Sequence, residues 1–416
     1  MSGLRRATLL LAVAAMVAAA PAARASISEV AGFDVGDAHV LASQYHSALD
    51  GFSMIPDFKP VSFTPNVRYI GSLTDEAGDL AAGGHLVGHY FYVTGSRGFA
   101  IYDVADPLHP KLASHVQFGA PRFENEDVDT NGSILLYSDF ATTRSLYVYD
   151  VTDKRHPRQL AELPDAGTHT MTCLYDCRFA YGSYHLNGPN GAPLRGGEIV
   201  DLRRPAHPKV IGDWTAKALP SRNNHDVIQV RPGWVLTASD PMELLDVSQG
   251  VTKPKVLAKG TNDGERLHTV VWPRNGQDKF ILSSFETNET PNCALSGEVS
   301  TWDATRWPTT HKITRLDSFH LSNGTYVDGN PPANPGLGCS PHWMQPRPDF
   351  YNGGIVALGA YDHGLKFLKV GHKGGIKEVG HFLPAGAETS AAYWVTPHIV
   401  YTVDYARGVD IVRFDG

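Results

Sequence analysis

The chain has 416 residues, of which 42% are hydrophobic, 10% aromatic and 19% charged. This composition excludes an intrinsically disordered protein, which would carry fewer apolar and more charged residues. The formal net charge of −7 argues against a nucleic-acid partner, because nucleic-acid-binding proteins present a basic surface.

The first 25 residues have the pattern of a secretory signal peptide. Arg5 and Arg6 form a basic region, Ala7–Ala20 is apolar, and Ala23–Ala25 matches an A-x-A cleavage site. The arginine pair also fits a twin-arginine signal, so the export route stays open. No later stretch approaches the 18 apolar residues of a transmembrane helix. We therefore expect a secreted, periplasmic or cell-surface protein without a transmembrane segment.

A repeated segment follows, in a chain with 41 glycines and 28 prolines between Val-, Ile- and Tyr-rich runs. Its clearest copies are Gly98–Pro110, Leu146–Pro157 and Glu198–Pro208, in which an apolar strand ends in Asp and a Pro-bearing turn comes next. Seven copies are anchored, 44 to 66 residues apart, at Asp103, Asp150, Asp201, Asp246, Asp303, Lys369 and Arg413. This period is typical of a four-stranded propeller blade.

The ends of the repeat array predict how the ring closes. The seventh copy ends at Gly416 without a fourth strand, whereas Val67–Leu73 has the fourth-strand pattern and no blade of its own. We expect this segment to pair as the outer strand of the last blade, which removes an open sheet edge. The predicted fold is all-β: a seven-bladed β-propeller over residues 67–416, closed by an N-terminal strand, with residues 26–66 wrapping outside.

The cleanest repeats resemble the LVIVD-repeat family of exported bacterial and archaeal propellers. The resemblance covers about 350 residues and is carried by the Gly-x-x-Ile-x-Asp-Val-x-Asp-Pro core that starts at Gly98. It implies a propeller fold and export. It implies no particular activity, since most of that family has none assigned.

A column of histidines is predicted at the start of the innermost strands. When the repeats are aligned, this column reads His85, Glu126, His169, His225, His268, His342 and Ser390. The residue two positions later is apolar in every copy: Val87, Val128, Met171, Val227, Val270, Met344 and Ala392. Because innermost strands line the central channel, we expect a ring of imidazoles at one channel mouth.

Converging neutral imidazoles are the commonest metal-ligand arrangement. His169, His225 and His268 are the first candidates for ligands, followed by His342 and His85. Nitrogen donors without thiolates favour copper, iron or zinc over calcium or magnesium. Two other interpretations stay open, namely histidines that only hydrogen-bond the backbone between blades, and a ring that binds an anion or polar ligand.

Several further residues are predicted to orient the imidazoles or to line the channel rim. They are Glu126, Asp226, Glu124, Glu265, Glu388 and His185. The long insertions Ser183–Gly197, Phe285–Gly297 and His320–Cys339 are expected on the same face as the ring, as a lid or binding rim.

Four cysteines in an exported chain favour disulfides. We favour the pairs Cys173–Cys177, within one hairpin, and Cys293–Cys339, which would staple two rim loops. Two free thiols at Cys173 and Cys177 remain an alternative.

Two functions are compatible with the sequence. One is an exported metal-dependent oxidoreductase acting on a small or extended organic ligand at the channel mouth. At the level of the fold it is similar to the carotenoid-cleaving oxygenases and the selenium-binding/methanethiol oxidase proteins, which hold a metal on channel histidines; no residue role transfers from them. The other is a non-catalytic cell-surface propeller that binds protein or glycan. The sequence indicates neither a catalytic residue nor an oligomeric state.

Overall fold

The structure is a computed structural model that describes most of the repeat array. The described residues are 60–73, 81–120, 122, 126, 128–140, 142–183, 197–215, 224–262, 267–286, 292–295, 297–325, 337–384 and 386–416. The predicted signal peptide, residues 1–25, and residues 26–59 of the predicted wrapping segment lie outside them.

Three consecutive stretches each fold into a four-stranded antiparallel sheet whose strand order follows the sequence. The first sheet contains β3 (Ala81–Val87), β4 (Tyr90–Gly95), β5 (Gly98–Asp103) and β6 (Lys111–Gln117). The second contains β7 (Asp129–Thr130), β8 (Ile134–Asp139), β9 (Ser145–Asp150) and β10 (Arg158–Leu163). The third contains β11 (Thr170–Leu174), β12 (Phe179–Ser183), β13 (Glu198–Asp201) and β14 (Lys209–Asp213).

The next two stretches join into one eight-stranded sheet with two antiparallel halves. The first half contains β15 (Asn224–Arg231), β16 (Trp234–Ser239), β17 (Glu243–Asp246) and β18 (Lys255–Gly260). The second contains β19 (Thr269–Val271), β20 (Phe280–Ser284), β21 (Val299–Asp303) and β22 (Lys312–Phe319). The halves meet where β18 and β22 pair in parallel, Lys259 with Lys312 and Gly260 with Ile313. The helical turns here are α5 (Pro273–Gly276), η2 (Cys293–Leu295), α6 (Trp307–Thr310) and η3 (Asn323–Thr325).

The last two sheets take strands from the beginning of the chain. One contains β23 (Met344–Pro346), β24 (Gly354–Gly359), β25 (Leu365–Val370) and β26 (Ile376–Pro384), with β1 (Pro60–Phe63) added at its edge. The other contains β27 (Thr389–Trp394), β28 (Ile399–Asp404), β29 (Gly408–Phe414) and β2 (Val67–Leu73). Strand β2 runs antiparallel to β29, from Val67 opposite Phe414 to Leu73 opposite Val409.

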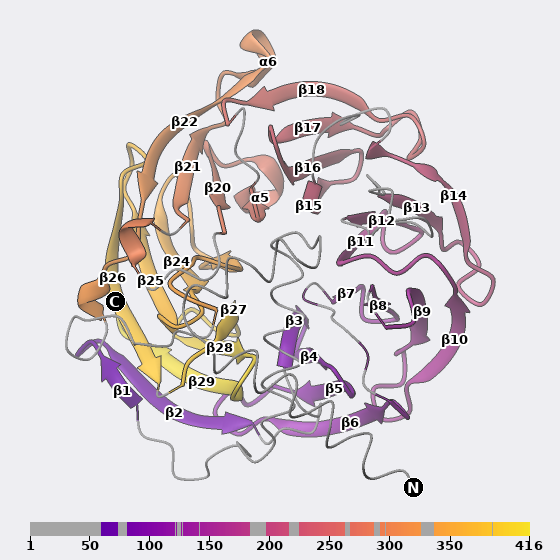
Figure 1. Cartoon of the computed structure of the whole chain (residues 1–416), viewed down its shortest axis with the longest axis horizontal. Coiled ribbons are helices and arrows are strands. Elements are labelled where there is room, and N and C mark those ends of the chain that lie inside the picture. Colours follow the sequence, from indigo (N-terminus) through magenta and orange to yellow (C-terminus); the bar gives the residue numbers. More distant parts are fainter. Residues whose placement is uncertain are drawn as a thin grey trace, which may run out of the picture.

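The sheets stand around a common centre, which makes the arrangement propeller-like (Figure 1). Strands β7, β11 and β15 lie near the centre, and β6, β10, β14 and β18 form part of the perimeter. The hydrophobic core lies between neighbouring sheets; Tyr92 and Phe99 of the first sheet, for example, pack with Leu135 and Tyr137 of the second. In this arrangement the first strands of neighbouring sheets contact one another around the centre of the molecule.

The repeated Asp caps the turn that follows its strand. In five sheets or half-sheets its Oδ1 accepts a hydrogen bond of 2.8–3.0 Å from the backbone N–H two residues later. The pairs are Asp103–Ala105, Asp150–Thr152, Asp201–Arg203, Asp246–Ser248 and Asp303–Thr305. Asp favours such turns because its short carboxylate reaches these N–H groups.

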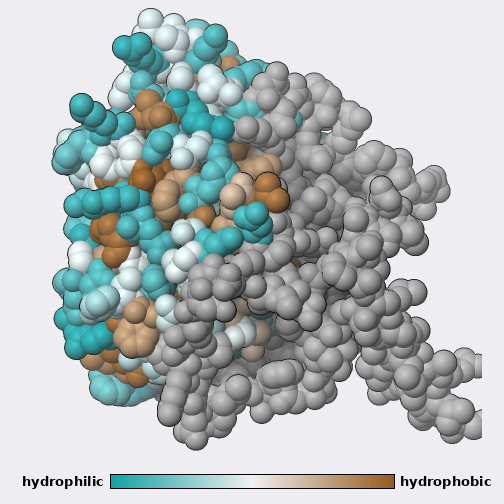
Figure 2. Space-filling model, turned by 60° about the vertical axis from the view of Figure 1, so that its left-hand side comes forward, coloured by the Kyte–Doolittle hydropathy of each residue, from teal (hydrophilic) through white to brown (hydrophobic). Residues whose placement is uncertain are grey.

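Hydrophilic residues cover most of the described surface turned to the viewer in Figure 2, with apolar residues in small groups between them. Such scattered apolar residues are normal on a protein surface. Among the described residues, none of the helices has the length and hydropathy needed to cross a bilayer.

Candidate metal centre

Four of the predicted histidines come together at the starts of neighbouring inner strands. His169 directly precedes β11, His225 lies in β15, His268 directly precedes β19, and His342 lies two residues before β23. All four are at most 1% exposed. The ring centroids of His169 and His225 are 4.7 Å apart, those of His225 and His268 3.9 Å, and those of His268 and His342 4.2 Å. The imidazoles therefore form one continuous buried row.

Two carboxylates share this space with the imidazoles. Oε2 of Glu126 lies 3.1 Å from Nε2 of His169, and its Oε1 lies 3.3 Å from Nε2 of His342. Glu286 approaches the same row, with Oε2 3.7 Å from Nε2 of His268. Three groups of three residues, drawn from these six, have donor atoms within 4.8 Å of one another. The six side chains could therefore hold a metal ion.

Backbone hydrogen bonds fix which nitrogen of two imidazoles faces the cluster. Nδ1 of His225 lies 2.9 Å from the carbonyl oxygen of His268, and Nδ1 of His342 lies 2.8 Å from that of Ser390. A carbonyl oxygen only accepts, so these Nδ1 atoms donate, and in a neutral imidazole of this tautomer Nε2 is the nitrogen with the lone pair. This orients Nε2 as a metal ligand.

Burial and neighbouring groups shift the pKa values of His268 and Glu126. Burial, reinforced by the neighbouring His342, lowers the pKa of His268 to about 4, so its imidazole is neutral. Burial alone would raise the pKa of Glu126, but His342 and His169 hold that pKa well below its ordinary value. Within the described residues neither ring nitrogen of His268 has a hydrogen-bond partner, although both are buried. A bound cation would satisfy this donor set.

Two tyrosines position the carboxylates. The hydroxyl of Tyr405 donates a 2.6 Å hydrogen bond to Oε1 of Glu126, and that of Tyr361 donates one of 2.5 Å to Oε1 of Glu286. The sequence interpretation missed Glu286, Tyr361 and Tyr405. The position of Glu286, just after a second strand and at the start of a rim insertion, was a usable signal, whereas the tyrosines carried none.

His85 is not part of the cluster, which corrects the predicted column. The hydroxyl of Ser390 donates to the carbonyl oxygen of Ala82, just as Nδ1 of His225 and of His342 contacts the carbonyl oxygen of His268 and of Ser390. This places Ala82, and not His85, at the equivalent position of the first sheet. Bulges occur at equivalent places, between Ala81 and Gly83 and between Asn224 and Asp226. The Gly-rich start of β3 has no clear apolar alternation, so the sequence specifies its register weakly.

His85 lies three residues farther along β3, roughly 10 Å by strand geometry. There its side chain is 34% exposed and its Nδ1 is 3.5 Å from Oδ1 of Asp129. Together with Thr172 and Gln229, these two residues line a separate cavity of about 340 Å³.

The remaining predicted rim residues lie elsewhere. Asp226 is buried beside His225 but belongs to none of the described groups of potential metal ligands. Glu388 accepts a hydrogen bond from the backbone N–H of Leu337, and burial together with Asp362 and Asp404 raises its pKa well above the ordinary value. Glu124, Glu265 and His185 lie outside the described residues.

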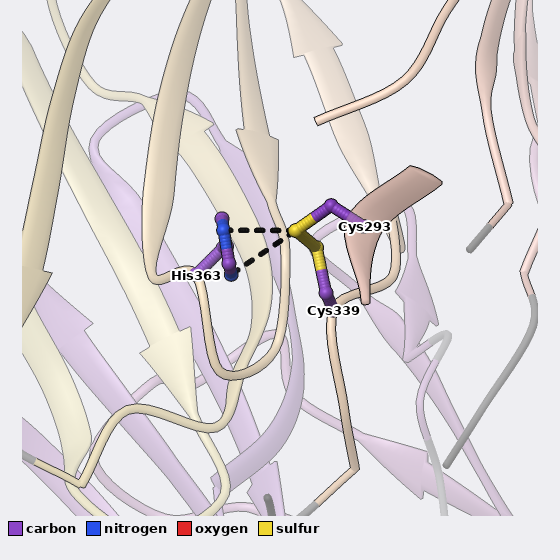
Figure 3. Close-up of side chains that lie close together, drawn as sticks. All are labelled: Cys293, Cys339 and His363. Atoms are coloured by element: carbon purple, nitrogen blue, oxygen red, sulfur yellow. Dashed lines mark hydrogen bonds between the residues drawn. A yellow bond between two sulfur atoms is a disulfide. The ribbon is translucent and has the colours of Figure 1, made fainter. Parts of the chain in front are cut away.

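Both disulfides have the pairing favoured from the sequence, Cys173–Cys177 and Cys293–Cys339. Figure 3 shows His363 beside the second bond, with Nε2 3.1 Å from Sγ of Cys293. These three residues form a further group of potential metal ligands. A disulfide offers no thiolate, however, and thiolate is the form in which cysteine binds metals. This group is therefore not a metal site while the disulfide is intact.

Comparisons with known proteins leave the family open. No family model matches the chain, and no curated protein matches it. Among solved structures it is similar to one described as "KlHsv2 with loop 6CD replaced by a Gly-Ser linker", at 9% identity and a TM-score of 0.47, covering 79% of this chain and 91% of that chain. A likeness at this level carries no argument about function. The resemblance to the LVIVD-repeat family stays a prediction.

Proposed function

We propose that this protein binds a transition metal in the buried cluster of His169, His225, His268, His342, Glu126 and Glu286. The observation that carries the proposal is the convergence of four imidazoles and two carboxylates in one buried space. Buried ionisable groups are costly unless they are paired or coordinate a metal. Imidazoles around a carboxylate supply the donor atoms for that coordination.

The cluster would lie in the channel of a seven-bladed propeller closed by β2. The described residues form six antiparallel sets of four strands, counting the eight-stranded sheet as two, and one set of four that β1 extends to five. These seven sets support the proposal, as does the pairing of β2 with β29. We also propose that the protein is exported. The two disulfides support an extracellular location, because such bonds persist in oxidising compartments.

Both described cysteine pairs are oxidised, so the cluster offers nitrogen and oxygen donors, which suit copper, iron and zinc alike. We choose copper or iron for the proposal, because these two ions are redox-active and zinc is not. A redox-active ion there would supply one-electron and dioxygen chemistry. The protein is accordingly proposed to be a metal-dependent oxidoreductase for a small organic ligand that enters from the channel mouth. In this scheme Tyr361 and Tyr405 hold the two carboxylates in place and the surrounding burial excludes water.

Metal analysis of the purified protein tests the proposal. We expect at least one equivalent of copper or iron per chain, and a large loss in H225A and H268A. The surface variant H109A is the matched control, because the His109 side chain is 79% exposed and pairs only locally with Asp106. Metal-free wild-type protein that also fails to take up added copper or iron would overturn the proposal and favour a non-catalytic binding propeller.

A further inference from the structure

We propose that the cluster holds two metal ions, bridged by the carboxylate of Glu126. This inference rests on the proposed function, because it concerns the same side chains. It goes further in assigning two half-sites, one formed by His169 and His225 and the other by His268 and His342.

The two oxygens of Glu126 face different histidines. Oε2 is 3.1 Å from Nε2 of His169 and 3.7 Å from Nε2 of His268, whereas Oε1 is 3.3 Å from Nε2 of His342. The nearest imidazole to each oxygen therefore belongs to a different half-site. A carboxylate that chelates one ion turns both oxygens toward the same point. A carboxylate whose oxygens face opposite ends of a row of ligands is instead placed to give one oxygen to each of two ions.

The six donors are spread too widely for a single ion. Ligand atoms bound at roughly 2.0–2.2 Å can lie no more than about 4.4 Å apart, which is twice the bond length. The donors do not merge into one group even with a limit of 4.8 Å; they divide into three overlapping groups. Two of these groups are Glu126 with His169 and His225, and Glu126 with His268 and His342. Glu126 is the member that they share.

Glu286 lies across the junction of the half-sites. It forms the third group with His225 of one pair and His268 of the other. It also lies 3.9 Å from Nε2 of His342. A second carboxylate in this position can bind either ion or both, and it adds the negative charge that two adjacent cations require.

Each ion would then have two imidazoles and one oxygen of Glu126, with positions left for other ligands. Two metal ions in such centres lie about 3.5–4 Å apart and act together on one bound group. The ligand class that fits is a small molecule with oxygen donors that can span both ions.

Copper loading of the apoprotein distinguishes one ion from two. We expect two copper(II) ions per chain, with an EPR signal well below that of two isolated ions because neighbouring copper(II) centres couple magnetically. The double variants H169A/H225A and H268A/H342A should each keep about one copper and recover the uncoupled signal. E126Q should lose the coupling while its circular dichroism melting curve stays close to that of the wild type.

Each other outcome has a defined meaning. A stoichiometry of one in the wild type, or loss of all copper in both double variants, would overturn the two-ion centre and leave the proposed function standing. Failure of the apoprotein to bind either copper or iron would instead overturn the proposed function. Two uncoupled ions, one of which is lost in H85A, would place the second ion in the separate cavity beside His85. That result would also contradict a bridge formed by Glu126.

Discussion

The hydroxyl of Tyr405 lies 2.6 Å from Oε1 of Glu126, the same oxygen that faces Nε2 of His342. Tyr405 directly follows β28 near the end of the chain, whereas Glu126 precedes β7, 279 residues earlier. The hydrogen bond thus joins the segment before the second sheet to the turn between β28 and β29 of the last sheet. It fixes the direction of the carboxylate before any metal binds.

Removing this hydrogen bond should weaken metal binding without unfolding the protein. Partners that orient a metal ligand contribute about 10- to 100-fold in affinity. We therefore expect Y405F to lower copper affinity within that range, measured by competition with a chelator. The matched control is Y401F, since the Tyr401 hydroxyl donates to the backbone of Pro107 instead of to the cluster. Equal affinities of Y405F and wild type would show that Tyr405 does not position Glu126.

The sequence was informative where the repeat is regular. His169, His225, His268 and His342 could be aligned because well-patterned apolar strands surround them, and the structure brings these four together. Glu126 was predicted to orient the imidazoles or to line the channel rim, and its carboxylate lies among the imidazoles. Glu286 and Tyr405 come from connections between strands, whose paths depend on tertiary packing and leave no periodic signal in the sequence.

The variants H85A and H225A should differ in metal content. H225A removes an imidazole from the buried row, so copper or iron occupancy should fall severalfold. H85A changes a partly exposed residue that lies three positions beyond Ala82 in β3. The metal occupancy of the cluster should therefore stay at the wild-type level. Elemental analysis of both variants, purified side by side, decides between the predicted column and the observed register. A loss in H85A equal to that in H225A would restore the original column.

Removing β2 should destabilise the whole ring. Val67 is fully buried and Leu73 is 6% exposed, and burying two such side chains contributes about 3–6 kcal/mol. Two truncated chains, one beginning at Val67 and one at Thr74, isolate this effect because both lack β1. The shorter chain should have the lower melting temperature and a smaller free energy of unfolding in urea. Identical melting curves would be incompatible with a ring closed by β2.

The two disulfides should differ in their contribution to stability. Cys293 and Cys339 are 46 residues apart, whereas Cys173 and Cys177 are only 4 apart. In the chain-entropy description, closing the longer loop stabilises the fold by about 4 kcal/mol and the shorter one by about 2 kcal/mol. We expect C293S/C339S to lose about twice as much unfolding free energy as C173S/C177S in urea titrations. An unreduced digest of the wild type should contain the Cys293–Cys339 linked peptide, and a peptide with any other partner would contradict the pairing.

The buried side chain of Lys366 should make the free energy of unfolding depend on pH, independently of the metal centre. Its ammonium group is fully buried in β25, 3.9 Å from Oε1 of Glu378, and burial lowers its pKa from 10.5 to about 8. Below pH 8 the folded protein must therefore hold a charge that burial disfavours. Between pH 8 and 10.5 the unfolded chain binds more protons than the folded one, so this cost falls as the pH rises.

K366M should consequently be more stable than the wild type at pH 7, by roughly 3 kcal/mol for a shift of this size. Methionine fills a similar apolar volume, and Glu378 keeps its 3.1 Å contact with Nδ1 of His381. Urea unfolding at pH 7, 9 and 10.5 should show the advantage shrinking step by step toward zero. K369M, at an exposed position of the same strand, is the control and should show no such trend. A K366M protein that is less stable than the wild type at pH 7, or whose advantage does not change with pH, would mean that the buried ammonium is not a cost to folding.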